Sequence, residues 1–445
     1  MRPSRLVALA LVVVALGAYI YFVERKAPTT DEVQERADKL FPGLEQDKVT
    51  RVEITNTHGR FELVKAGDDW KLAVPITDDA NGGAVSGLLS SLAFLKAERT
   101  LEAKDVKLAD YGLQDARLTL TVHDDTGATR TLKVGDDLPL GAERAALTTG
   151  EKVFMIGKYI ATDIDRDLAG WRSTELARVM SADVASLTVR SAAGRVALAH
   201  AQGVWALTEP IADLADRDRA EGLIGSINGA QVKEHVDAPG DLAALGLASP
   251  RVEVTIVRKD DKAPLQLAFG NEREVVGAKQ VACRRGDRVM WVDASAISNA
   301  GGTLVDWRSR RLVALDTWNA EALAVGSGGA KAALERKDGI WKSGDVEVDG
   351  DAVSRRLATL SDLQVVGFDV PGPVGSPLGT VEVKVKDGAG LDVKLYPGTE
   401  PGSAIAEVKG RAGFFAVDAA RVQELLADPA SLAAPRPTPA PTPTP

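Results

Sequence analysis

Few side chains in this sequence stand at a spacing that supports catalysis or metal binding. Cys283 is the single cysteine, and the four histidines are His58, His123, His200 and His235. A reactive thiolate needs a histidine or a helix N-terminus nearby to lower its pKa, and no such partner stands near Cys283 in the sequence. No two histidines have the H-E-x-x-H or H-x3-5-H spacing of a zinc site. We therefore expect no catalytic residue, no metal and no cofactor.

Three shorter patterns have only weak chemical interpretations. The stretch "VGSGGAK" at 325–331 lacks the full phosphate-loop pattern, and "RGD" at 285–287 is a three-letter match. Adjacent aspartates at 68–69, 124–125 and 136–137 could form acid–base pairs or bind a cation, but no calcium-loop spacing accompanies them. Aspartate and glycine are typical of turns, where they satisfy local backbone geometry. We expect all of these segments to be turns.

The composition suits folded domains and argues against nucleic-acid binding. The chain has 445 residues, of which 45% are hydrophobic and 26% charged, with a formal net charge of -9. An acidic chain without clustered lysine and arginine is poorly suited to binding phosphates. One cysteine cannot build an intrachain disulfide framework. The length suggests about three domains of ordinary size.

One tryptophan phrase recurs three times and reveals internal repeats. It reads "GDDWKLAVPI" at 67–76, "QGVWALTEPI" at 202–211 and "KDGIWKSGDV" at 337–346. A large indole at the same place in three copies indicates core packing. Downstream of each tryptophan, apolar residues recur at i, i+4, i+7 and i+10, which share one buried helix face. They are Val85, Leu89, Leu92 and Leu95; Ala220, Ile224, Ile227 and Ala230; and Val353, Leu357, Leu360 and Leu363.

Alternating strands follow each predicted helix. They are introduced by "YGLQDARLTLTV" at 111–122, "LGLASPRVEVTIV" at 245–257 and "SPLGTVEVKVK" at 376–386. In the last, valines at 381, 383 and 385 alternate with charged residues, as in a half-buried antiparallel strand. We therefore predict an α+β fold: an N-terminal transmembrane helix followed by three tandem homologous α+β repeat domains with mainly antiparallel sheets. The repeats cover 45–180, 181–316 and 317–432.

The repeats serve as internal controls for unusual residues. Cys283 aligns with Leu147 and Val408, which predicts a buried, unreactive thiol in a strand. His200 stands where Lys65 and Arg336 stand, which predicts an exposed position. Asp293 and Asp418 follow the last strands of their repeats, where we expect them to cap short helices.

The two ends of the sequence differ from the repeats. Leu6–Val23 is an unbroken apolar stretch, and 18 residues at about 1.5 Å each cross most of a roughly 30 Å hydrocarbon layer. We predict an anchor helix over residues 1–26 and a linker over 27–44. A cleaved signal peptide is the alternative, but bulky residues follow the small ones where cleavage would occur. Residues 433–445 are Pro-rich and predict a disordered tail.

The order of these motifs resembles the bacterial proteins grouped as domain of unknown function 4340. An anchor and the strand "DKVTRVEI" precede "YGL", "RLTLTV", "TLKVGDDLP", "VFMI" and "LAGWRSTEL", and the likeness covers residues 45–430 in three passes. The first repeat departs from the usual "YGL...P" phrase at Gln114 and Asp115, and the third lacks "WRS". The resemblance implies an envelope protein associated with ABC-type exporters or with auxiliary components similar to those of gliding motility. It supplies no catalytic residues.

Three classes of function are therefore open. The first is a non-enzymatic accessory or scaffold protein, single-pass in the bacterial inner membrane and mainly periplasmic, which contacts a transporter permease or auxiliary subunit. The alternative is a module that binds cell-wall glycan or another extracytoplasmic ligand. It predicts exposed aromatic residues found in only one repeat, and the unmatched Trp291 and Trp318 are the candidates. The third is an enzyme with an unrecognised site.

The anchor predicts the topology of the chain. Arg2 and Arg5 before the apolar stretch favour a cytoplasmic amino terminus, although Arg25 and Lys26 follow it. A reporter that is active only in oxidising compartments, fused after residue 432, should therefore give signal in intact cells. An expressed fusion without signal would reverse the topology.

Overall fold

The computed structural model describes residues 39–435, apart from 139–142, 149, 151, 261–262, 387 and 389. The predicted anchor over Leu6–Val23 lies outside the described residues, as does the end of the chain from residue 436. Within the described ranges, no helix combines the length and the apolar character needed to span a membrane.

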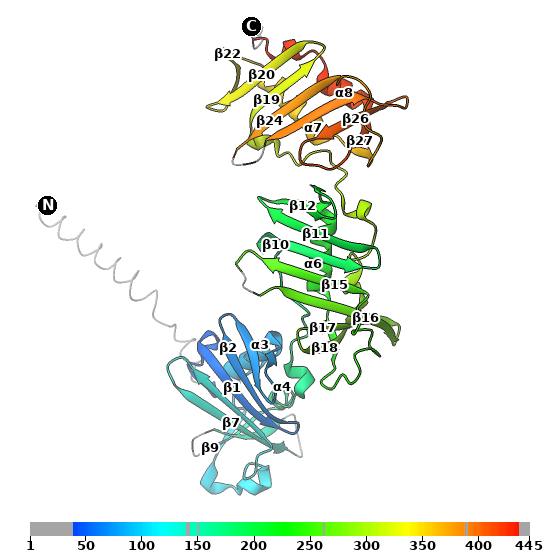
Figure 1. The fold of residues 1–445 in the computed structure, drawn as a ribbon. Helices are drawn as coiled ribbons and strands as arrows, with labels where there is room; N and C mark the ends of the chain where they lie inside the picture. Colours follow the sequence, from blue (N-terminus) through cyan, green and yellow to red (C-terminus); the bar gives the residue numbers. More distant parts are fainter. Residues whose placement is uncertain are drawn as a thin grey trace, which may run out of the picture. The chain divides into compact units, whose positions relative to one another are not determined.

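Three antiparallel sheets of nine strands each follow one another along the described chain (Figure 1). The strand order of the first sheet is β4-β3-β2-β1-β6-β7-β8-β9-β5, and the other two repeat it with their own strands. Two antiparallel meanders thus meet at the β1–β6 pair. The prediction of tandem α+β repeats with mainly antiparallel sheets is confirmed.

Each sheet lies within one predicted repeat. The first contains β1 (Val49–Asn56), β2 (Gly59–Ala66), β3 (Asp69–Val74), β4 (Asp78–Asp79), β5 (Arg99–Glu102), β6 (Leu118–Asp124), β7 (Thr129–Asp137), β8 (Glu143–Leu147) and β9 (Lys152–Gly157). The second contains β10 (Val184–Ser191), β11 (Gly194–Ala201), β12 (Val204–Glu209), β13 (Asp213–Leu214), β14 (Val232–His235), β15 (Val252–Arg258), β16 (Leu265–Val275), β17 (Ala278–Arg285) and β18 (Arg288–Asp293). The third contains β19 (Ala320–Ser327), β20 (Ala330–Lys337), β21 (Ile340–Ser343), β22 (Val346–Glu347), β23 (Val365–Gly367), β24 (Gly379–Val385), β25 (Leu391–Pro397), β26 (Ser403–Val408) and β27 (Phe415–Asp418).

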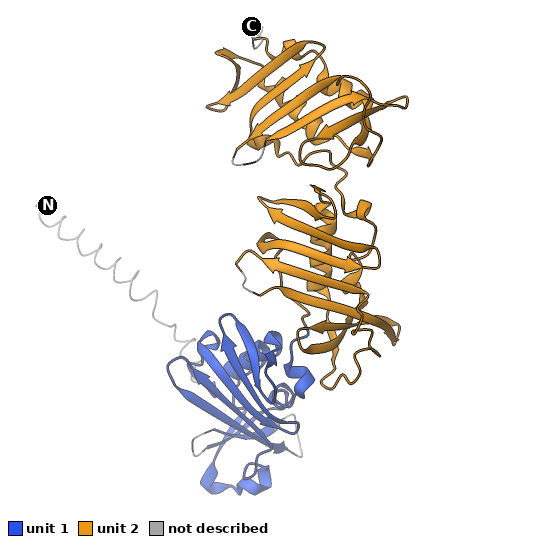
Figure 2. Ribbon diagram, viewed as in Figure 1, with its two compact units in different colours: residues 1–174 blue, residues 175–445 orange. Residues whose placement is uncertain are grey.

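The chain divides into two compact units, residues 1–174 and 175–445 (Figure 2). The first sheet lies in the first unit, and the second and third sheets lie together in the second. The exact boundaries of the three repeats stay a prediction.

One helix of 12 or 13 residues covers each sheet: α3 (Gly82–Ala93), α6 (Arg217–Gly229) and α7 (Gly350–Ser361). Each begins at a polar N-cap, Asn81, Asp216 or Asp349, whose side chain accepts a backbone N–H bond. All twelve residues of the predicted helix face are at most 3% exposed, but the last of each set, Leu95, Ala230 or Leu363, lies just after its helix ends. Shorter helices are α4 (Tyr159–Ile164), α5 (Leu168–Trp171), α8 (Ala419–Leu426) and α9 (Pro429–Leu432).

Each sheet and its helix enclose a separate hydrophobic core that contains the repeated tryptophan. Trp70, Trp205 and Trp341 are 8%, 1% and 6% exposed and belong to the three largest clusters of buried residues. The prediction that these residues serve packing is confirmed.

The prediction that His200 is exposed is wrong. His200 is 8% exposed, and its ring stacks on Trp205 with centroids 4.4 Å apart. The two residues are direct partners across the β11–β12 pair, so their side chains share the core face. Lys65 and Arg336 pair with Trp70 and Trp341 in the same way. These long side chains can cover the indole and still reach carbonyl oxygens at the edge, of Asp47 and Trp318 respectively.

Cys283 is buried as predicted, but its alignment was shifted. Cys283 pairs with Phe269 in β16. The residues equivalent to Phe269 in the first and third repeats are Val134 and Leu395, which pair with Ala146 and Ala406. The counterparts of Cys283 are therefore alanines, and the slip arises because the β17–β18 turn is shorter than the β8–β9 and β26–β27 connections. Because side chains alternate across a sheet, a one-residue shift would place the thiol on the opposite face.

One of the two predicted caps is confirmed. Asp418 caps α8 by accepting a bond from the Arg421 N–H. Asp293 precedes a short 3-10 helix (Ala294–Ile297) without capping it, because its carboxylate instead accepts the Gln231 N–H.

Glycines explain the "YGL" phrase in the first two repeats. The segment ending at Leu113 crosses β7 so closely that a Cβ on Gly135 would lie 2.0 Å from the Tyr111 carbonyl oxygen. In the second repeat, a Cβ on Gly270 would lie 2.1 Å from the Leu245 carbonyl oxygen. The crossing builds a second small cluster, which in the second repeat contains Trp291, 9% exposed. The third repeat departs from this pattern, because Gly379 lies within β24.

The repeated tryptophan gives a test of the core. Trp205→Ala should lower the free energy of unfolding of its repeat by about 3–5 kcal/mol, because truncation of a buried indole leaves a cavity. Denaturant unfolding followed by circular dichroism measures this change. The exposed Trp318→Ala is the matched control, and we expect it to stay within about 0.5 kcal/mol of wild type. A similarly small effect for Trp205→Ala would contradict the packing role.

Candidate functional site: the open sheet faces

The side of each sheet away from its long helix is only partly covered. In the first repeat the central part of this side consists of the outward side chains of β1, β2 and β6. Strands β10, β11 and β15, and β19, β20 and β24, form it in the other two. We call these surfaces the first, second and third open faces.

The three open faces have the same backbone register. Arg51 of β1 pairs with Val64 and His123, Ser186 with Ala199 and Val257, and Ala322 with Glu335 and Lys384. Two residues later, Glu53 pairs with Glu62 and Thr121, Thr188 with Ala197 and Thr255, and Ala324 with Ala333 and Glu382. Six positions can therefore be compared directly across the repeats.

The first open face is filled by charges that pair with one another. Glu53 is 2.9 Å from Arg51, 3.3 Å from Arg60 and 3.1 Å from His123 Nε2. Arg51 also lies 3.0 Å from Glu62. Half-exposed pairs such as these contribute little stability individually. Their main effect here is to occupy the surface with groups that already have partners.

The second open face is neutral at the six compared positions. These positions hold Ser186, Thr188, Ala197, Ala199, Thr255 and Val257. Charged side chains, Arg190, Arg195 and Glu253, follow further along the same faces of β10, β11 and β15.

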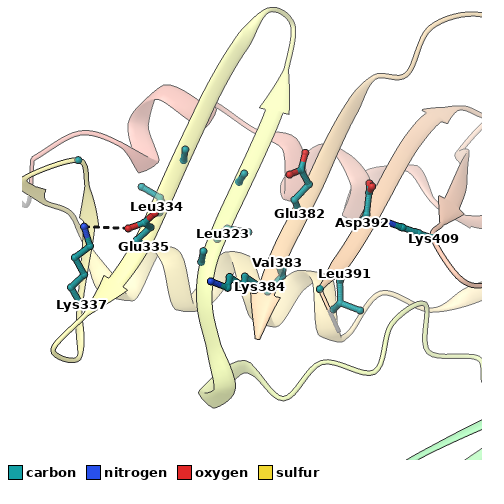
Figure 3. Close-up of a pocket in the computed structure, with 15 residues that line it drawn as sticks. Leu323, Leu334, Glu335, Lys337, Glu382, Val383, Lys384, Leu391, Asp392 and Lys409 are labelled. Carbon is teal, nitrogen blue, oxygen red and sulfur yellow. Dashed lines mark ion pairs between the residues drawn. The ribbon is translucent and has the colours of Figure 1, made fainter. Parts of the chain in front are cut away.

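The third open face is a groove with an alanine floor and charged walls. Its cavity has a volume of about 730 Å³, and its floor includes Ala322, Ala324 and Ala333. Figure 3 shows Glu335, Glu382 and Asp392 along it, from β20, β24 and β25 respectively. Glu335 pairs with Lys337 at 3.2 Å. The lining also contains the lysines Lys384 and Lys409.

The lining of this groove is a mixture of charged and apolar side chains. Its lining supplies carboxylates and ammonium groups but no histidine, cysteine or hydroxyl nucleophile. Among the described residues, the side chains of Glu382, Lys384 and Asp392 have no hydrogen-bond or ion-pair partner within the chain. An alanine floor lets a ligand approach the sheet closely while these charges remain available to it. The alternation of Val381, Val383 and Val385 predicted that Glu382 and Lys384 face outward. Glu335, Asp392 and Lys409 were missed, because only the strand register brings them to the same surface.

The residues weighed for chemistry in the sequence are dispersed. His58 lies in the β1–β2 turn, His123 on the first open face, His200 in a core and His235 at the end of β14. Burial raises the pKa of the Cys283 thiol well above its usual range, which disfavours the reactive thiolate. No group of three His, Cys, Asp or Glu side chains within the described ranges is arranged to hold a metal ion.

Two of the three short patterns are turns, as predicted, whereas the expectation for the adjacent aspartates is wrong in part, because Asp136 and Asp137 lie within β7 and Asp69 begins β3. "VGSGGAK" spans the β19–β20 hairpin, with Gly328 and Gly329 at positive φ, and "RGD" spans the β17–β18 turn. Asp124 accepts backbone bonds from Thr126 and Ala128. Hydrogen bonds from the side chains of Thr126 and Arg130 hold the pKa of Asp124 well below its usual range.

Of the two tryptophans proposed for glycan binding, only Trp318 is exposed. Its exposed fraction is 81%, whereas Trp291 is buried under the Arg273 guanidinium, which lies 4.0 Å from the ring centroid. Trp318 belongs to a 3-10 helix, Thr317–Asn319, just before β19.

Taken together, fold and open faces define a protein of tandem antiparallel α+β repeats whose surfaces suit binding. The family model "Domain of unknown function (DUF4340)" matches residues 70–204 and 205–379, and the chain belongs to this family. The two matched regions start at Trp70 and Trp205, so each begins within the third strand of a repeat. The chain matches no curated protein and no solved structure.

Proposed function

We propose that this protein is a non-enzymatic accessory scaffold, anchored in the bacterial inner membrane by Leu6–Val23, with its repeats in the periplasm. Its open faces contact a membrane protein, which we propose to be the permease or auxiliary subunit of an ABC-type transporter or of related envelope machinery. The third open face is the main contact.

The divergence of the open faces on a common sheet supports this proposal. The alternate residues on the buried side of these strands are apolar in all three repeats. The six compared positions on the open side change from paired charges to neutral groups to a charged groove. A core is constrained by packing, whereas surface positions are free to differ. Three chemically distinct surfaces on one scaffold suit contacts with different parts of a large partner. Exposed, unpaired charges give such contacts specificity.

Filling the alanine floor tests the contact. Ala324→Arg should leave the free energy of unfolding within about 0.5 kcal/mol, because residue 324 is on the open side of the sheet. It should also abolish crosslinking of a photoreactive amino acid at position 333 to the membrane partner in intact cells, identified by mass spectrometry.

Thr188→Arg is the matched control, because Thr188 is the equivalent residue of the second open face. We expect it to retain the adduct. An unchanged adduct in Ala324→Arg, or adducts with no reproducible membrane protein in wild type, would refute the third open face as the contact.

The alternative function, binding of cell-wall glycan, is favoured by the exposure of Trp318. An indole combines a large apolar face with a polar N–H and is suited to a partly wet contact. Asp316 and Asn319 beside it add polar groups.

A binding assay separates this alternative from the scaffold. If it is correct, purified cell-wall glycan should retain the solubilised chain. Trp318→Ala should weaken retention about tenfold or more, as truncation of an aromatic hot spot does. Phe94→Ala is the control, because Phe94 is another exposed aromatic residue, at 58%. A wild-type chain that passes through the glycan unretained rules this alternative out.

A further inference from the structure

Two arginines from different repeats share one buried aspartate within the second compact unit. Asp213 lies in β13, and Arg308 belongs to the "WRS" phrase of the same repeat; both side chains are fully buried. Arg308 Nε donates to one carboxylate oxygen of Asp213. Arg411 lies in the β26–β27 turn of the third repeat, and its Nε donates to the other carboxylate oxygen of Asp213. The aspartate therefore joins the second repeat to the third.

Further hydrogen bonds run in both directions across this junction. Arg308 donates to Asp369 at 2.6 Å and to the Ala412 carbonyl oxygen at 3.3 Å, both in the third repeat. Arg411 donates to carbonyl oxygens of residues 309, 311 and 312 at 2.8–3.2 Å. The Ala412 N–H donates to the Ala212 carbonyl oxygen at 2.8 Å. Two cations and two carboxylates thus balance, and each guanidinium has several acceptors.

A cluster of this kind fixes geometry more strictly than an apolar contact does. Guanidinium groups bind through directional bonds in a planar fork, and a buried charge that loses its partner is costly. Small rotations between the repeats would break these bonds without replacement. We propose that Asp213, Arg308 and Arg411 form a lock that holds the second and third repeats in one relative orientation. The end of the second repeat is thus a docking surface, and its partner is a following repeat that presents an arginine on this turn.

Comparison of the repeats supports this docking role. The N–H groups of Ala80, Ala215 and Val348 each donate to the carbonyl of the repeated tryptophan at 3.0 Å, which makes Asp78, Asp213 and Val346 equivalent. Isolated bridges from the same three residues reach Arg172, Arg308 and Pro435. The first repeat has its own buried pair, Arg172 and Asp78 at 2.7 Å. The third repeat has valine and proline at the equivalent positions.

The segment of the third repeat that contacts Arg308 also has a recognisable sequence pattern. Asp369 opens the phrase "DVPG" at 369–372, and the second repeat has "DAPG" at 237–240. The first repeat has no such phrase. The aspartate–arginine pair thus occurs in the first and second repeats, and the D-x-P-G phrase in the second and third. Within the second unit, the phrase of the third repeat supplies Asp369, which accepts a hydrogen bond from Arg308 of the second repeat.

Distance measurements between spin labels test the lock in the detergent-solubilised full chain. Asp218→Cys in α6 and Ala420→Cys in α8 supply exposed label sites in the second and third repeats, and Cys283 is buried and stays unlabelled. The chain with both labels and an intact lock should give one narrow distance. Arg411→Gln and Asp213→Asn should each replace it with a broad distribution. Hydrogen exchange at the Ala412 amide should speed up about tenfold or more.

Asp78→Asn is the matched control, because it breaks the same kind of buried pair in the first unit. It should leave the distance between the labels unchanged. Arg411→Gln is the decisive variant if Asp213→Asn unfolds the second repeat, and its circular dichroism spectrum should match wild type. A narrow, unshifted distance in folded Arg411→Gln overturns the lock, as does equal broadening in Asp78→Asn.

Discussion

The pairing of β1 with β6, and of its counterparts β10 with β15 and β19 with β24, is the constraint on which each repeat depends. It joins the two meanders of a sheet, and its two strands are separated in sequence by the long helix. All three pairs have the same irregularity near their start, between Val49 and Arg51, Val184 and Ser186, and Ala320 and Ala322. After this irregularity, the residues of all three strand pairs are matched in the same register. The helix must therefore return the chain to one fixed position, which requires its apolar face to pack on the sheet in one way. The tryptophan core, the crossing glycines and the open faces all take their positions from this pair.

The sequence predicted the features that burial imposes periodically. The nine residues of the predicted face that lie in the long helices, and the alternation in β24, follow from the periods of 3.6 and 2 residues. These patterns are visible without an alignment of homologues. Internal repetition strengthened them, since the tryptophan at 70, 205 and 341 could be explained once for three positions. The same reasoning identified "VGSGGAK" and "RGD" as turns. Local chemistry was sufficient in these cases because the decisive neighbours lie within a few residues.

Properties set by neighbours across strands were not predictable. His200 was assigned to the surface by analogy with charged residues. The analogy was correct, but the shared position faces the core, where long side chains cover an indole. Cys283 was aligned with the wrong residues because the turn after β17 is shorter than the matching turns of the other repeats. Glu335, Asp392 and Lys409 form one groove only after several strands have paired. Asp213 and Arg411 are 198 residues apart in sequence, and no local pattern connects them.

The unequal ends of the repeats have a consequence for how this gene can vary. The folds are interchangeable in outline, but their order in the chain is not. If the third repeat were moved ahead of another repeat bearing the same turn arginine, that guanidinium would meet Val346 in place of a carboxylate. If the second repeat stood last, Asp213 and Arg308 would lose Arg411 and Asp369 and open to water. Duplication or shuffling of whole repeats is thus limited by charge balance at their ends, even though every rearranged copy could still build its own core.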